Sequence, residues 1–495
     1  MTASAIDTNP VNPGSRRSIR VHRRAMSRRK GTVIAAAVIT VLLSAGYVMA
    51  DVADVAPGLL TASSVKPVTF PTARTARTAK TVTGQLQNGP SIDASQAQKL
   101  VDEFAASEGV GTDFSLIIAD AQGNAVVKSN ETATREPAST MKTLTAFAAA
   151  STLDMTSTLD TEVYLTGSGD SAKLTLKGNG DMLLGSGESD PDHINGRAGI
   201  ATLVSRTVAA LRSKNITTVD LAYDDSLFGS KRLPDTIAAN NTDLMNAAPM
   251  ASMAIDQARN WTGTDKPSDP DVDTKFPPRS STPAADTASE FARQLTEQGI
   301  TVTGTSEGTA PQNGSPIASV SSAKLSEIMS FMLKNSNNTE AELLGRLTAL
   351  KTGQENSPEG ATKAVKSILE SHGISTTGLT MADCSGLSTG SQLTVETLMQ
   401  TQSQYAQTGT EVAAASEALA VSGLSGTALH HTFPSSSNGL IRLKTGTLDT
   451  VTSMTGNVSR TKGGVLTFAV IINNPQNMWS AIQALDHLVG QLPEL

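Results

Sequence analysis

The 495-residue chain has a single cysteine, Cys384, and aromatic residues make up only 3% of it. One cysteine excludes an internal disulfide. Scarce aromatics argue against the stacking surfaces of proteins that bind single-stranded nucleic acid. The six histidines show neither HExxH nor a comparable ligand spacing, so the sequence predicts no metal and no cofactor. No histidine nearby supports Cys384 as a nucleophile, and we expect it to be a small buried residue.

Negative charge predominates, with a formal net charge of −7, but residues 1–30 are an exception. They carry eight Arg and Lys residues and one acid, Asp7, which gives this segment +7 and leaves −14 on the rest of the chain. An acidic main body argues against a nucleic-acid partner. The basic segment therefore needs another explanation.

Thr32–Ala50, TVIAAAVITVLLSAGYVMA, supplies one, because its nineteen residues include no charge. This length crosses a bilayer, and the basic flank predicts that the N-terminus stays in the cytoplasm. A cleaved signal peptide is the alternative, since Ala50 is a small residue at a plausible cleavage site; the length of the run favours an uncleaved anchor. Either interpretation places the rest of the chain outside the cytoplasm, and a large core without disulfides fits a bacterial envelope protein.

Composition along the chain predicts an α/β protein in which one domain closes around an insertion. A hairpin is expected over Phe114–Ser129, a helix over Ala138–Leu153, and three antiparallel strands in Gly439–Asn474 before a helix over Met478–Leu492. Amphipathic helices are also expected over Ala323–Lys334 and Thr339–Lys351. The predicted segments are a cytoplasmic basic arm (1–31), the anchor (32–50), a Thr/Ala/Ser/Pro-rich tether (51–93), the first part of the main domain (94–159), a β-rich inserted region (160–317) and the second part of the main domain (318–495).

Copies of the Ser-x-x-Lys pattern, which places a hydroxyl and an amine on one face of a helix, include those that start at Ser27, Ser63, Ser139 and Ser321. The first two copies lie in the basic arm and the tether, and we interpret Ser321 as a helix cap. Only Ser139 opens a strongly apolar, Ala-rich helix. We therefore predict that Ser139 is a nucleophile and Lys142 its base.

A lysine acts as a base only if its pKa falls by roughly three units from ~10.4, through burial and neighbouring cations. A second cation in the site is therefore informative, and Lys-Thr-Gly occurs at Lys351 and at Lys444. The first copy ends a helix, where Lys followed by Gly is ordinary. The second lies between β-rich runs and predicts a substrate-binding strand edge made of Lys444, Thr445, Gly446 and Thr447.

The third element, Ser336-Asn337-Asn338, lies between two expected helices. Loop Ser and Asn residues are usually turn formers, and Ser-x-Asn also occurs at residues 213 and 436. The order of the three elements, in helix, loop and strand contexts, makes the combination far more specific than any one of them. We predict catalytic roles for Ser336 and Asn338.

Together these motifs resemble those of penicillin-binding proteins and related β-lactamases. The chain is most similar to class C low-molecular-mass penicillin-binding proteins, the D-alanyl-D-alanine carboxypeptidase/endopeptidase family. The likeness spans roughly residues 95–490, and the chain departs from the family at Thr339-Glu340, often an apolar-aromatic pair, and at Cys384, often glycine. The matching segments are PASTMKTLTA (137–146), GNGDMLL (178–184), DDSLF (224–228), SNN with AELLGR (336–346) and DCSGLS (383–388).

The resemblance implies an α/β (α+β) serine peptidase fold, three-layered with a central antiparallel sheet, and a large insertion between the first two motifs. It also implies acyl transfer on peptidoglycan stem peptides ending in D-Ala-D-Ala, inhibition by β-lactams, and a carboxypeptidase that could also act as an endopeptidase. In these roles Ser139 attacks, Lys142 takes its proton, Ser336 relays a proton and Asn338 orients Lys142. Lys444 and Thr447 would hold the terminal carboxylate.

Two alternatives remain. Gly304–Gly308 and Gly386–Gly390 match G-x-S-x-G, which would suggest an α/β-hydrolase, but neither has the required strand–turn–helix context or Asp-then-His order. The other is a penicillin-binding sensor or wall-binding protein that acylates without turnover, because the motifs report acylation better than deacylation. We also expect residues 160–317 to contribute no catalytic side chain, since all three motifs lie outside them.

Overall fold

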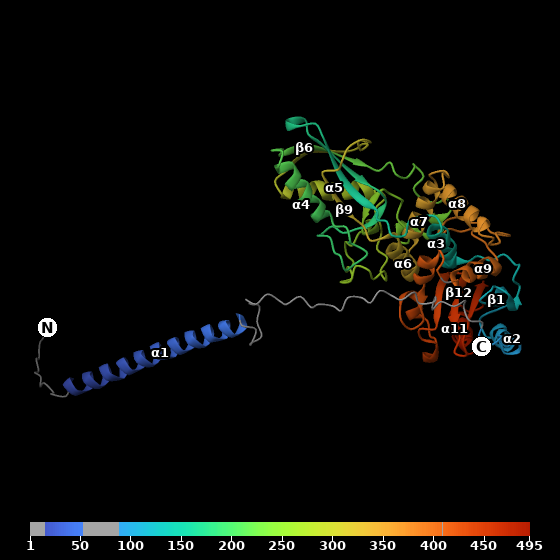
Figure 1. Ribbon diagram of the computed structural model, residues 1–495, viewed down its shortest axis with the longest axis horizontal. Helices are drawn as coiled ribbons and strands as arrows, with labels where there is room; N and C mark the ends of the chain where they lie inside the picture. Colours follow the sequence, from blue (N-terminus) through green and yellow to red (C-terminus); the bar gives the residue numbers. More distant parts are fainter. Residues whose placement is uncertain (1–14, 53–88, 408) are drawn as a thin grey trace, which may run out of the picture. The chain divides into compact units, whose positions relative to one another are not determined.

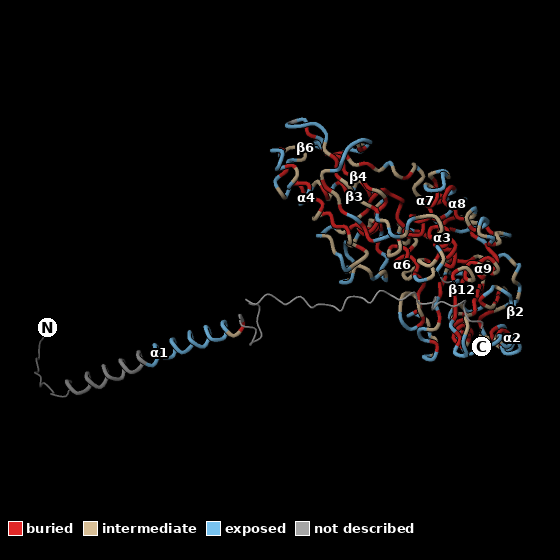
Figure 2. Tube along the Cα trace, viewed as in Figure 1, coloured by how far each residue is buried: buried red, intermediate tan, exposed pale blue. Residues whose placement is uncertain are grey.

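The structure, a computed structural model, describes residues 15–52, 89–407 and 409–495 (Figure 1). The chain divides into two units, Met1–Val82 and Thr83–Leu495. In the first, helix α1 covers Ser15–Val52, and its stretch Thr32–Asp51 has a mean hydropathy of 2.3. Residues 32–49 of this stretch are exposed (Figure 2). By length and composition this stretch could cross a membrane or serve as a signal sequence. The predicted tether lies almost wholly outside the described residues.

A six-stranded antiparallel sheet forms the centre of the second unit. Its strand order is β10-β11-β12-β13-β1-β2, so the first hairpin pairs with the last strand and joins the two parts of the main domain. The expected hairpin and the three C-terminal strands are confirmed. The strands are β1 (Phe114–Asp120), β2 (Ala125–Ser129), β10 (Ala420–Val421), β11 (Ile441–Leu448), β12 (Val451–Ser459) and β13 (Val465–Asn473).

Strand β1 shows why this sheet lies between two layers of helices. Its side chains alternate between faces: Leu116 and Ile118 join one apolar cluster, and Ile117 and Ala119 join another. The first cluster includes α2 (Ala94–Ala105) and α11 (Met478–Gln491), and the second includes α3 (Met141–Ala150) and α9 (Val395–Tyr405). The predicted three-layer fold with a central antiparallel sheet is confirmed (Figure 1).

The region between the motifs forms a second, five-stranded sheet of order β8-β6-β4-β3-β9, in which β4-β6 and β6-β8 are parallel pairs. The parallel pairs require crossovers, which contain α4 (Ile200–Arg212) and α5 (Pro283–Glu297). The prediction of a β-rich region did not include these helices; α4 is rich in β-branched residues and α5 follows a Pro-rich stretch. The strands are β3 (Asp160–Thr166), β4 (Lys173–Gly178), β6 (Thr218–Asp224), β8 (Thr301–Glu307) and β9 (Ala318–Ser321), and a separate short pair is β5 (Asp181–Leu184) with β7 (Met253–Ile255).

Helices carry the chain from the second sheet back to the first: α6 (Leu325–Asn335), α7 (Asn338–Lys351), α8 (Pro358–Ser371) and, after α9, α10 (Ala413–Glu417). The interpretation of Ser321 as a helix cap is wrong. Ser321 ends β9 and pairs with Asp160, and the N-terminus of α6 is closed by the Lys324 backbone N–H donating to Glu327. Because β9 belongs to the second sheet, we propose that the inserted region extends to Ser321 rather than ending at residue 317.

Candidate active site

Ser139 and Lys142 meet at the start of α3. Ser139 lies in a short 3-10 turn, Ala138–Thr140, that leads directly into the helix, so the predicted single helix is in fact two. Ala138 has a positive φ of 49°, a strained conformation for a residue with a side chain, which turns the chain sharply before the serine. Lys142 Nζ donates to Ser139 Oγ at 2.8 Å. The predicted nucleophile and base are therefore in direct contact.

The Lys142 amine is fully buried and has two further acceptors, Asn338 Oδ1 at 2.7 Å and the Ser385 carbonyl at 2.8 Å. Burial lowers the pKa of Lys142 to about 7, although the nearby carboxyls of Asp383 and Glu342 act in the opposite direction. From the sequence we expect both burial and neighbouring cations to lower this pKa. In the structure the lowering comes from burial and, among the described residues, not from a neighbouring cation, and a fraction of the amine is neutral at physiological pH.

Asp383 and its loop explain why a carbonyl faces the amine. The Asp383 carboxylate accepts hydrogen bonds from the backbone N–H groups of Ser385, Gly386 and Ser388 and from Ser385 Oγ. These bonds fix the tight turn that presents the Ser385 carbonyl to Lys142. The segment DCSGLS matches the family, but its sequence predicts no such role, because a contact through a backbone carbonyl leaves no residue-type signal.

The Ser336-Asn337-Asn338 element joins α6 to α7. Ser336 adopts the left-handed conformation, with φ of 58°, and Asn337 caps α7 by accepting from the Glu340 N–H. Asn338 is the first residue of α7 and reaches Lys142 with its amide oxygen. Ser336 Oγ accepts from Lys444 Nζ at 3.0 Å.

Strand β11 forms the opposite wall of the site. Lys444 is fully buried, and burial, with Lys142 as a second cause, lowers its pKa. A methyl group on Gly446 would lie 2.9 Å from both the Pro137 carbonyl and the Ser139 backbone nitrogen, so only glycine lets β11 approach the nucleophile this closely. Thr445 Oγ1 donates to Thr427 at 2.9 Å, and Thr447 is exposed to the cavity.

The structure thus brings all eight sequence-predicted residues together around a cavity of about 1000 Å³. Ser139, Ser336, Asn338 and Thr447 line it, whereas the two lysines lie behind their hydroxyl partners. Part of the wall was missed: residues of the inserted region also line the cavity. They are Ala239, Asn240, Thr242, Met245, Asn246, Asp273, Thr274 and Phe276.

The competing nucleophiles lie in other settings. Cys384 is buried as expected, and burial raises the pKa of its thiol well above the usual range. Ser306 lies in strand β8, and the Ser388 hydroxyl is buried without a hydrogen-bond partner. Among the described residues neither hydroxyl bonds to a histidine, so the α/β-hydrolase alternative has no support in the described geometry.

Ser139 is hydrogen-bonded to the buried, desolvated amine of Lys142, and a second serine–lysine pair, Ser336 and Lys444, lies in the same site. This arrangement defines the class of penicillin-recognising serine peptidases. A family model described as "D-Ala-D-Ala carboxypeptidase 3 (S13) family" matches residues 97–278 and 271–492. The chain therefore belongs to the D-Ala-D-Ala carboxypeptidase 3 (S13) family. It is a serine-type D-alanyl-D-alanine carboxypeptidase of the bacterial cell wall, which confirms the resemblance drawn from its motifs.

Individual relatives agree with this placement. Carboxypeptidase Rv3627c of Mycobacterium tuberculosis is 32% identical over 345 residues, covering 68% of this chain and 71% of its own. Carboxypeptidase DacB of Mycolicibacterium smegmatis is 31% identical with the same coverage. The crystal structure of penicillin binding protein 4 (dacB) from Haemophilus influenzae superposes with a TM-score of 0.64 at 21% identity, over 82% of this chain and all of that one. This last likeness concerns the fold.

The close approach at Gly446 generates a prediction. Gly446→Ala should push β11 away from Ser139 and lower the rate of acylation by a labelled penicillin about tenfold or more, since overpacking a tight contact costs ~1–3 kcal/mol. The matched change Gly187→Ala should have no effect, because a methyl group there meets nothing within 4 Å. Equal acylation rates for the two variants would contradict the geometric role of Gly446.

Proposed function

We propose that this carboxypeptidase removes the terminal D-alanine from peptidoglycan stem peptides ending in D-Ala-D-Ala, through an acyl-enzyme on Ser139. The observation that carries the proposal is the contact between Ser139 Oγ and the Lys142 amine, whose pKa burial lowers to about 7. A serine hydroxyl needs a base to attack a peptide carbonyl, and an amine with this pKa is half neutral near pH 7.

In the first step Lys142 Nζ takes the Ser139 proton as Oγ attacks the carbonyl of the penultimate D-alanine. The oxyanion that forms would be held by the backbone N–H groups of Ser139 and Thr447, and the proximity of β11 to the Ser139 nitrogen supports this assignment. The tetrahedral intermediate then breaks the peptide bond. Ser336 relays to the departing amine the proton that Lys142 took from Ser139, D-alanine leaves, and water hydrolyses the ester to regenerate Ser139.

The remaining residues hold the reactants. Asn338 orients the Lys142 amine through its amide oxygen, at 2.7 Å. Lys444, whose Nζ donates to Ser336 Oγ at 3.0 Å, attracts the terminal carboxylate of the substrate. Thr445, Gly446 and Thr447 complete this strand edge, with Thr447 free to donate to the carboxylate. β-Lactams would inhibit the enzyme by acylating the same serine.

We infer that the enzyme acts outside the cytoplasm of a bacterium, held at the membrane by residues 32–50 with its N-terminus inside. The length, apolar character and exposure of Thr32–Asp51 support this, together with the basic residues before it. The protein would then meet peptidoglycan from the membrane side.

The catalytic proposal predicts that Ser139→Ala abolishes both labelling by penicillin and release of D-alanine, with the fold unchanged. Lys142→Ala should do nearly the same, because the hydroxyl then has no base. The matched motif copies Ser321→Ala and Lys351→Ala should cost little, since they lie outside the site. Peptide mapping should find the adduct on Ser139; an adduct on Ser306, Ser388 or Cys384 would overturn the assignment.

Mass analysis of digested peptidoglycan fragments separates the activities. Loss of one D-alanine identifies a carboxypeptidase, cleaved cross-links identify an endopeptidase, and the absence of any product identifies a sensor that acylates without turnover.

The topology proposal predicts that a reporter active only in the cytoplasm is silent when fused after Leu495. The same reporter fused after residue 31 should be active, which controls for expression. The mass of the mature protein then distinguishes an uncleaved anchor from a signal peptide removed after Ala50. Strong reporter activity after Leu495 would refute export.

A further inference from the structure

The inserted region not only lines the cavity but also holds the loop that carries Ser336 and Asn338. Three successive residues at the start of α7 have partners there. Asn338 Nδ2 donates to the Asn246 carbonyl at 3.0 Å, and Thr339 Oγ1 accepts from the Ala248 N–H at 3.0 Å. Asn337, between the two motif residues, makes the most extensive contacts.

The Asn337 side chain is 4% exposed and uses its donors and its acceptor together. Its Oδ1 accepts from the Glu340 N–H at 3.0 Å, which caps α7. Its Nδ2 donates to Asp273 Oδ2 at 2.6 Å and to Gln257 Oε1 at 2.8 Å. Any rotation of this amide would leave buried polar groups unpaired, so its position fixes the backbone between Ser336 and Asn338.

Asp273 is in turn fixed by charge. Its other carboxylate oxygen forms an ion pair with Arg259, whose second partner is Asp256 at 3.1 Å. The side chains of all three are 2–4% exposed. Removing one member of such a buried group leaves an uncompensated charge, so the cluster acts as a unit.

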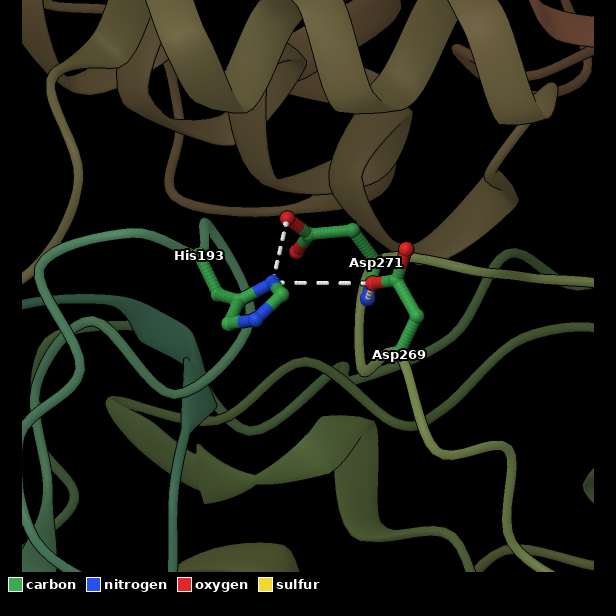
Figure 3. Close-up of side chains that lie close together, drawn as sticks. All are labelled: His193, Asp269 and Asp271. Carbon is green, nitrogen blue, oxygen red and sulfur yellow. Dashed lines mark hydrogen bonds and ion pairs between the residues drawn. The ribbon is translucent and has the colours of Figure 1, made fainter.

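The chain segment leading to Asp273 is also anchored (Figure 3). The Asp271 carboxylate faces His193 and accepts from the backbone N–H groups of Ile194 and Asn195, at 3.0 and 2.8 Å. The Asn195 side-chain amide donates to Asp256 Oδ1 at 2.7 Å, and Asp256 is itself a member of the ionic cluster with Arg259 and Asp273. Hydrogen bonds therefore hold the segment that carries Asp273 in place. Its carboxylate offers a charged hydrogen-bond acceptor to the active-site loop Ser336–Asn338.

We propose that Asp273 is a positioning residue of this carboxypeptidase: it acts through Asn337 to keep Ser336 Oγ on Lys444 and Asn338 Oδ1 on Lys142. This inference rests on the proposed roles of Ser336 and Asn338. It adds that Asp273, a residue of the inserted region that belongs to none of the motifs, holds the loop that carries them. It assigns the inserted region a part in turnover even though it supplies no group to the chemistry.

The test is an exchange of donor and acceptor across the contact. Asn337→Asp keeps a cap for α7, since Asp and Asn are equivalent there, but sets two carboxylates against each other. We expect kcat for D-alanine release to fall about tenfold to hundredfold, with KM changed by less than about threefold. Adding Asp273→Asn restores a donor opposite an acceptor. The double variant keeps the number of buried carboxylates, and Arg259 keeps its partner Asp256, so kcat should recover to within about fivefold of the parent. Gln257 Nε2, buried without a partner, can turn to the new carboxylate.

The control is Asp265→Asn, the same change at an exposed site of the inserted region, which should leave kcat and the melting temperature unchanged. Two results would overturn the proposal. The first is a double variant whose loss of kcat equals the product of the losses in the two single variants. The second is an Asp273→Asn variant that raises KM at constant kcat, which would mean that Asp273 contacts the substrate directly. If Asn337→Asp does not fold, the kcat-against-KM split of Asp273→Asn alone decides. Penicillin acylation of the parent, measured in parallel, tests the proposed function separately.

Discussion

The site depends on the desolvation of one amine. Lys142 has no exposed surface, and each of its hydrogen bonds ends on an oxygen: a serine hydroxyl, an asparagine amide and a backbone carbonyl. Water would stabilise the ammonium form and return the pKa toward its ordinary value. The amine is surrounded by α3, which carries it, by α7 and by β11. These elements therefore keep its pKa low by excluding solvent.

That requirement explains why one site draws on distant parts of the chain. The central sheet joins the hairpin β1-β2 to β13, which brings α3 and its serine against β11. The inserted region contains none of the three catalytic motifs, yet its residues Asn246, Ala248, Gln257 and Asp273 all bond to the first turn of α7 or the residue before it. A catalytic loop built from a left-handed residue and a helix cap has few internal hydrogen bonds, and the insertion provides the missing ones.

Much of this architecture could be predicted from sequence because it depends on residue type and order. Ser139, Lys142, Ser336, Asn338 and Lys444 have side chains whose chemistry needs partners, and their helix, loop and strand contexts were readable from periodicity. The role of Ser385 was not readable, since a backbone carbonyl carries no side-chain signal. Helix α4 was missed because its β-branched residues are typical of strands, and α5 was missed because it follows a Pro-rich stretch that is typical of turns. The pairing of Asp273 with Asn337 across 64 residues is set by tertiary packing alone.

The pH dependence of penicillin acylation tests the central claim most directly. If an uncharged Lys142 is the base, the second-order rate of labelling should rise about tenfold per pH unit below the pKa and level off above it. The inflection should lie at about 7, the value that burial gives this amine. Lys142→Arg, which keeps the charge at every pH in this range, should label slowly and without an inflection. A parent rate that is flat or falling between about pH 5 and 8 would contradict the account of Lys142 as a neutral base.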